Sequence, residues 1–124
     1  MSTRTKKLGD WGEEKAVQYL IENGYTIIKR NFRWARGEID IVAENDDLLI
    51  FIEVKTAASA QMGEPANWVT QRKQKQIAQV AQKFLQDNRI ENKDCRFDVI
   101  GIMKSGNTFE IQHIENAFWL EQTY

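Results

Sequence analysis

The strongest constraint on the fold is a pair of apolar segments, residues 37–42 and 48–55, separated by a short polar stretch. The stretch at 45–47 reads Asn-Asp-Asp, a composition typical of a hairpin turn. The second segment is apolar at alternating positions on both faces, which is the pattern of a strand buried on both sides. We therefore expect a hairpin that delivers a central strand to a layered α/β protein.

Charged residues interrupt this hairpin where a buried strand should be apolar. Asp40 lies in the first segment, and Glu53 and Lys55 lie near the end of the second. An unpaired buried charge costs several kcal/mol, so such residues are usually paired, metal-bound or functional. Glu53 and Lys55 project to one face because strand side chains alternate, and the C-terminal end of a strand is a common place for a site.

The remaining pattern predicts one α/β domain over residues 1–124, with a mixed central sheet flanked by helices in the order α-β-β-β-α-β-β. Outside the hairpin, we expect a flexible arm at 1–8, a helix at 10–23, a strand at 25–34, a loop at 57–67, a helix at 69–87, strands at 97–103 and 109–114, and a short helix or tail at 117–124.

Bulk composition excludes several classes of protein. The net charge of −1 gives no global field, so any attraction for nucleic acid must be local. The single cysteine, Cys95, excludes an internal disulfide and a cysteine-rich zinc module. No apolar stretch reaches the roughly 20 residues of a membrane span. We expect a cytoplasmic protein that does not engage a membrane.

Two carboxylates and a lysine at one strand end suit a hard divalent cation and a hydrolytic reaction. Asp40 and Glu53 could hold Mg²⁺ or Mn²⁺, and the Val54 carbonyl could supply a further oxygen. Lys55 could orient the attacking water or offset charge on a phosphate. The alternative is a structural ion-pair cluster at the strand end.

Two local stretches are basic. One contains Arg33 and Arg36 interleaved with aromatic residues, a combination that suits phosphate contacts and base stacking. The other, in the second expected helix, contains Arg72, Lys73 and Lys75, which together with Gln74 are further candidates for contact with nucleic acid. The simpler interpretation of the second stretch is a solvated helix face.

Other polar residues have structural interpretations. We expect Asp98 to form a structural ion pair, and a structural role is favoured for the lone histidine, His113. Glu38 could support Asp40 or pair with Arg36.

The chain resembles the YraN-type family of endonuclease-like bacterial proteins, within the PD-(D/E)XK superfamily of restriction endonucleases and Holliday-junction resolvases. The resemblance covers about residues 8–118. Its core is Asp40 followed by Glu53-Val54-Lys55, and it is supported by Gly9-Asp10-Trp11-Gly12-Glu13, Asn31-Phe32-Arg33, Gly37-Glu38-Ile39-Asp40, Arg72-Lys73, Arg96-Phe97-Asp98-Val99-Ile100 and Asn116-Ala117-Phe118.

This resemblance implies a restriction endonuclease-like fold and a metal-dependent nuclease acting on nucleic acid, with DNA favoured and branched DNA as one substrate. By analogy it also implies a homodimer. It adds Glu13 to the catalytic and metal-binding set, although Glu13 could instead close a capping box with Asp10. It further places Gln74 and Lys75 near the metal. Ala57 departs from the family, which usually has an arginine there.

Two other functional classes remain open. The same fold could serve as a nucleic-acid-binding or adaptor domain with little or no catalysis, for which Ala57 leaves room. A protein-interaction domain would show no salt-sensitive binding to nucleic acid.

Overall fold

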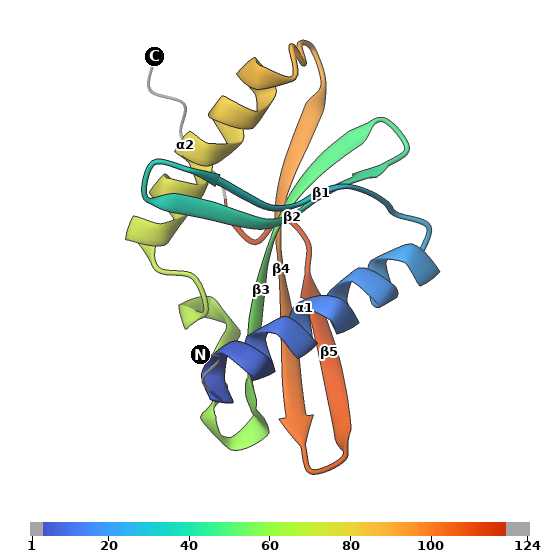
Figure 1. The fold of residues 1–124 in the computed structure, drawn as a ribbon, viewed down its shortest axis with the longest axis vertical. Coiled ribbons are helices and arrows are strands. Elements are labelled where there is room, and N and C mark those ends of the chain that lie inside the picture. The colour runs from blue at the N-terminus through green and yellow to red at the C-terminus, as the bar shows by residue number, and fades with distance from the viewer. Residues whose placement is uncertain (1–3, 119–124) are drawn as a thin grey trace.

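The computed structural model describes residues 4–118, and Figure 1 shows a twisted sheet with one long helix on each face. The elements follow the expected order: α1 (Arg4–Glu22), β1 (Thr26–Trp34), β2 (Gly37–Asn45), β3 (Leu48–Ala58), α2 (Gln71–Asp87), β4 (Asp94–Ser105) and β5 (Thr108–Ile114). Short 3₁₀ turns, η1 (Ser59–Gln61) and η2 (Pro65–Asn67), occupy the stretch expected to be a loop.

The five strands are arranged in sequence order, β1-β2-β3-β4-β5. All neighbours are antiparallel except β3 and β4, which are parallel and are connected through α2. The sheet is therefore mixed, and β3 is its central strand, as the sequence predicts. A long crossover is needed here because parallel strands cannot be joined by a tight turn.

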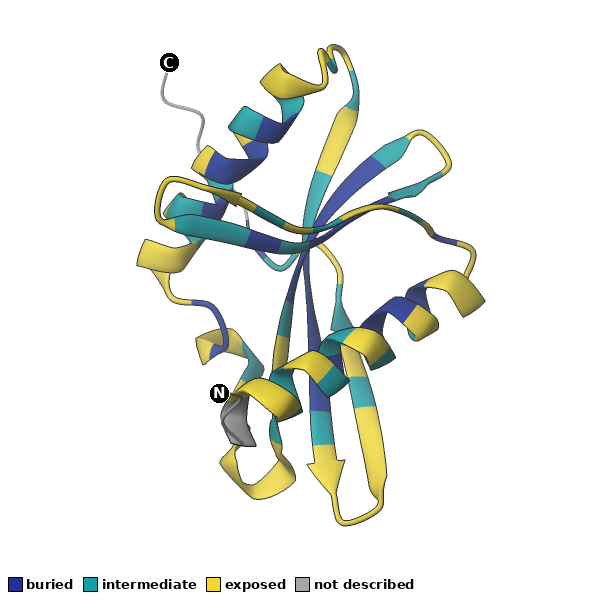
Figure 2. Ribbon diagram, viewed as in Figure 1, coloured by how far each residue is buried: buried dark blue, intermediate teal, exposed yellow. Residues whose placement is uncertain are grey.

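The sheet buries a separate apolar cluster on each face. Leu49 and Phe51 of β3 pack toward α2, whereas Ile50 and Ile52 pack toward α1. This alternation confirms that β3 is apolar on both faces. Figure 2 shows the consequence, since the buried residues concentrate along β2, β3 and β4 and on the inner sides of the helices.

The first helix differs from its expected start. The sequence predicts a flexible arm over 1–8 and an N-cap at Asp10, but α1 already begins at Arg4. Leu8 and Trp11 lie one turn apart and are partly buried, so they extend the apolar stripe that anchors the helix. Asp10 is consequently inside the helix, and the predicted capping box with Glu13 is wrong.

Other boundaries shift by a few residues. The second helix begins at Gln71, with Thr70 as its N-cap. Most of the segment expected at 117–124 lies outside the described residues, and Ala117 and Phe118 are in neither helix nor strand. None of the described helices is long and apolar enough to cross a membrane.

Candidate functional site

The hairpin brings Asp40 and Glu53 together where β2 and β3 separate. The antiparallel ladder pairs Ile41 with Ile52, so Asp40 and Glu53 are the next residues along each strand. The backbone ladder stops at that pair. The next hydrogen bond between the strands runs from the Val54 backbone N–H to the Asp40 carboxyl group, at 2.8 Å. The two acids are therefore neighbours in the structure, and Val54 contacts Asp40 through its N–H.

Burial makes this carboxyl pair electrostatically unfavourable when both members are charged. Burial and the neighbouring Glu53 charge raise the pKa of Asp40 to about 8, although the hydrogen bond from Val54 opposes the shift. Burial also raises the pKa of Glu53. The Lys73 ammonium opposes the rise in the pKa of Glu53, and so does the neighbouring Asp40 side chain.

Lys73 reaches the same pair from the first turn of α2. The Thr70 hydroxyl caps this helix by accepting from the Lys73 backbone N–H at 3.2 Å. The Lys73 ammonium lies 2.5 Å from Glu53 Oε1. Burial lowers the pKa of Lys73, but the Glu53 carboxylate outweighs it and the net shift is upward. The sequence placed Lys73 among residues that contact nucleic acid, and it did not predict this ion pair.

Glu13 approaches the pair from α1. Burial raises the pKa of Glu13, the Arg30 guanidinium at 3.8 Å opposes that shift, and the Glu13 charge helps to raise the pKa of Asp40. Glu13 Oε1 is buried and lacks a hydrogen-bond partner, as does Arg30 Nε. A buried carboxylate oxygen without a donor is costly, and an additional cation would satisfy it.

The donor chemistry of these residues fits a divalent cation. Mg²⁺ and Mn²⁺ prefer carboxylate and carbonyl oxygens, and Asp40, Glu53 and Val54 offer both. Residues 4–118 nevertheless contain no cluster of three or more acidic, histidine or cysteine side chains at metal-binding spacing. Asp40 and Glu53 are thus the core of the candidate site, and Glu13 stands next to it.

Lys55 is exposed at the end of β3 and lines an open hollow at that end of the sheet. Ala57 lines the same hollow, where positive charge is supplied by Lys7, Lys55 and Lys104. Sequence alone could not predict that Lys7 and Lys104 line the same hollow as Lys55, because three separate elements contribute them.

The residues expected to contact nucleic acid are dispersed. Arg33 pairs with Glu38, which corrects the alternative in which Glu38 pairs with Arg36. The Gln74 amide donates to the Val69 carbonyl at 3.1 Å. The remaining members of the set are exposed: Arg36, Arg72 and Lys75.

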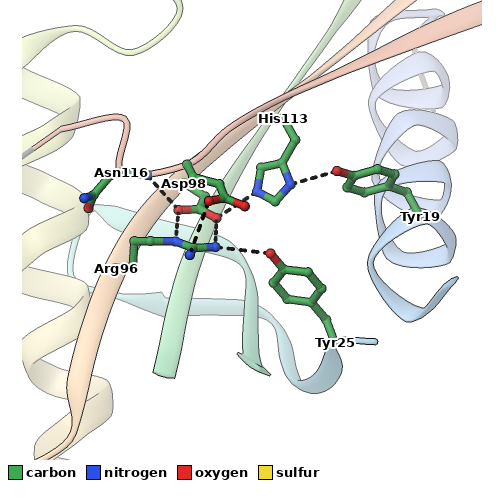
Figure 3. A network of polar contacts seen from close by, with 7 residues as sticks. Tyr19, Tyr25, Arg96, Asp98, His113 and Asn116 are labelled. Carbon is green, nitrogen blue, oxygen red and sulfur yellow. Dashed lines mark hydrogen bonds and ion pairs between the residues drawn. The ribbon is translucent and has the colours of Figure 1, made fainter. Parts of the chain in front are cut away.

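A second polar cluster, centred on Asp98, lies on the α1 face of the sheet (Figure 3). Arg96 donates to both Asp98 oxygens at 2.8 Å, and His113 Nε2 lies 2.7 Å from Asp98 Oδ2. His113 Nδ1 lies 2.9 Å from the Tyr19 hydroxyl. Together these bonds lower the pKa of Asp98 despite its burial. The expected ion pair of Asp98 is confirmed, and His113 is bound within its network.

Comparison with known proteins gives matches over most of the chain. A sequence model of the uncharacterised protein family UPF0102 matches residues 12–102. A UPF0102 protein of Prosthecochloris aestuarii is 44% identical over 98% of this chain and 100% of its own length. UPF0102 proteins of Chlorobium phaeobacteroides strain BS1 (46% identical; 95% and 98% covered) and Geobacter metallireducens (47%; 97% and 98%) are similar.

Proposed function

We propose that this chain, which belongs to the uncharacterised protein family UPF0102, is a metal-dependent nuclease that hydrolyses phosphodiester bonds. The observation that carries the proposal is the pair formed by half-buried Asp40 and buried Glu53, in which the pKa of Asp40 is raised to about 8. Two carboxyl groups that resist ionising together are an arrangement that a divalent cation stabilises. The pattern of acids and lysine on this mixed sheet also supports a restriction endonuclease-like topology.

The chain's own residues have distinct roles in this proposal. Asp40 and Glu53, with the Val54 carbonyl, would hold Mg²⁺ or Mn²⁺, and Glu13 would complete the charge around it. The bound cation would supply Lewis-acid chemistry to a phosphoryl group. Lys55, exposed two residues after Glu53, would orient the attacking water and offset the charge that develops on the phosphate. DNA is the proposed substrate, with branched DNA among its forms.

One observation favours a second candidate, a nucleic-acid-binding domain without catalysis. Lys73 already neutralises Glu53 at 2.5 Å, and it thereby supplies part of the positive charge that a metal would bring. In that case the cluster stabilises the fold and the exposed basic residues contact phosphates.

A cleavage assay separates the two candidates. End-labelled single-stranded, duplex, flap and four-way-junction DNA would be incubated with Mg²⁺ or Mn²⁺ and with wild-type, Asp40→Asn, Glu53→Gln or Lys55→Ala protein. Glu91→Gln is the matched control, because Glu91 is exposed and precedes β4 at the opposite end of the sheet. Metal-dependent cutting that is lost in the three site variants and kept in Glu91→Gln supports the nuclease. Binding without cutting on every substrate supports the second candidate.

A further inference from the structure

The hollow beside Lys55 has the size and charge of a nucleotide-binding site. Its volume is about 790 Å³, and it opens between the N-terminal turns of α1, the end of β3, η1 and the end of β4. Three lysines line it, namely Lys7, Lys55 and Lys104, and none of its described lining residues is acidic. In a chain with a net charge of −1, this is a local concentration of positive charge that favours phosphate.

An aromatic ring forms one wall of the hollow. Trp11 is partly buried, and its ring meets the ring of Phe109 edge-on, with centroids 5.2 Å apart. The Lys104 ammonium lies 5.4 Å from the Trp11 ring centroid. Trp11 and Lys104 both line the hollow, with the Lys104 ammonium over the indole ring. An indole in the wall of such a hollow is suited to stack an unpaired base when the lysine over it moves to a phosphate.

The wall that carries Trp11 is held against β3 by a close helix–strand contact. Gly12, the next residue of α1, packs so tightly on Thr56 that an added Cβ would lie 2.8 Å from the Thr56 Cβ. Thr56 is also part of the hollow's lining. The distance between the indole and the end of β3 is therefore set by backbone packing, and the site is preformed.

We propose that this hollow binds unpaired nucleotides of a nucleic-acid strand, with Trp11 stacked on a base and Lys7 and Lys104 on the flanking phosphates. The inference rests on the proposed function only for placing the scissile phosphate beside Lys55. A base inside a duplex is already stacked and paired, so Trp11 selects strands that have unpaired nucleotides next to the cleavage point. The substrate class is thereby narrowed to single strands, flaps and frayed junctions.

Fluorescence anisotropy with labelled dT12 and rU12 tests this proposal, and EDTA keeps the measurement independent of cleavage. A dT12 duplexed with dA12 and a dT12 that carries central abasic sites are measured beside them. The proteins are wild type, Trp11→Leu, the double variant Lys7→Gln/Lys104→Gln, and Arg89→Gln. Arg89 follows α2 at the other end of β4, so its substitution removes one positive charge far from the hollow.

We expect Trp11→Leu to bind dT12 or rU12 about tenfold more weakly than wild type, whichever strand wild type prefers. Wild type should bind the abasic oligomer more weakly than dT12. Trp11→Leu should bind the two oligomers with equal affinity. This comparison remains valid if the substitution perturbs folding, because wild type alone must distinguish the two oligomers. The double lysine variant should reduce the slope of log affinity against log salt by about 1.4, and Arg89→Gln should not.

Equal binding of dT12 and the abasic oligomer by wild type would overturn the proposal, as would preference for the duplex or a salt slope unchanged in the double variant. The two proposals fail separately. Binding that depends on Trp11, without any cleavage, would contradict the proposed nuclease and support the proposed binding site. Cleavage and binding that are both unaffected by Trp11→Leu would contradict the binding site and support the nuclease.

Discussion

The Asp40 carboxyl group accepts the Val54 backbone N–H at 2.8 Å, so one side chain both ends the β2–β3 ladder and forms half of the candidate site. The same residue therefore couples the fold of the hairpin to the protonation of the site. That coupling can be measured without knowing the substrate.

Stability should fall as pH rises through the titration of Asp40. Its pKa of about 8 in the folded protein lies above the ordinary aspartate value of 3.8. Between these values the folded protein holds a proton that the unfolded chain releases, so rising pH favours unfolding. We expect the urea-derived free energy of unfolding to decline between about pH 4 and pH 8, and Asp40→Asn to lose most of that decline. An unchanged pH slope in Asp40→Asn would contradict the assignment.

Divalent cations should compete with this proton. If Asp40 and Glu53 bind Mn²⁺, binding must displace the proton of Asp40, so affinity should rise from pH 6 to pH 8. Calorimetry in buffers of different ionisation enthalpy would report the released proton directly. Binding of Mn²⁺ that is independent of pH and unchanged in Asp40→Asn would place the ion elsewhere.

Lys73 should act against metal binding and in favour of nucleic-acid binding. Its ammonium is ion-paired with the Glu53 carboxylate at 2.5 Å and competes with a metal ion for it. Lys73→Gln should therefore strengthen Mn²⁺ binding several-fold. The variant should also weaken binding of DNA. Lys75→Gln is the control, because Lys75 is exposed two residues further along α2. Equal effects of the two substitutions on Mn²⁺ affinity would show that the ion pair does not compete.

The sequence predicted the parts of the fold and site that depend on local pattern. Alternating apolar residues around Phe51 indicate a central strand, and charges at Asp40 and Glu53 stand out because they break that pattern. The N-terminal start of α1 could not be predicted, because Leu8 extends its stripe only once the sheet is present. Trp34 is a large aromatic residue that sequence alone favours for the core, yet it is 42% exposed because β1 is an edge strand.

Contacts between distant elements were beyond prediction. Lys73 is one of several basic residues on α2, and only the crossover geometry singles it out as the partner of Glu53. The family resemblance pointed to Glu13, whereas the buried Oε1 atom that lacks a hydrogen-bond partner is visible only in the folded chain. The lining of the hollow could not be predicted either, because Lys7 and Lys104 lie 97 positions apart in the sequence.

The Asp98 network should be a major source of stability. Asp98 is 1% exposed and is charged, with Arg96 and His113 as its partners. Asp98→Asn leaves the partly buried Arg96 guanidinium with only the exposed Glu115 as counter-charge and should cost about 3 kcal/mol in the free energy of unfolding. Glu115→Gln is the control, since Glu115 is exposed and 3.6 Å from Arg96, and should cost less than about 1 kcal/mol. Similar urea midpoints for both variants would contradict the network.

The two glycines of α1 should respond to alanine in opposite directions. A Cβ on Gly9 meets nothing within 4 Å, so Gly9→Ala gains helix propensity and should stabilise the protein by up to about 1 kcal/mol. A Cβ on Gly12 would overlap the Thr56 side chain, so Gly12→Ala must push α1 away from β3 and should destabilise by about 1–3 kcal/mol. Thermal or urea unfolding measures both effects. Because the substitutions are chemically identical and one turn apart, a stabilising Gly12→Ala would show that the helix–strand contact, and the hollow wall built on it, is not tight.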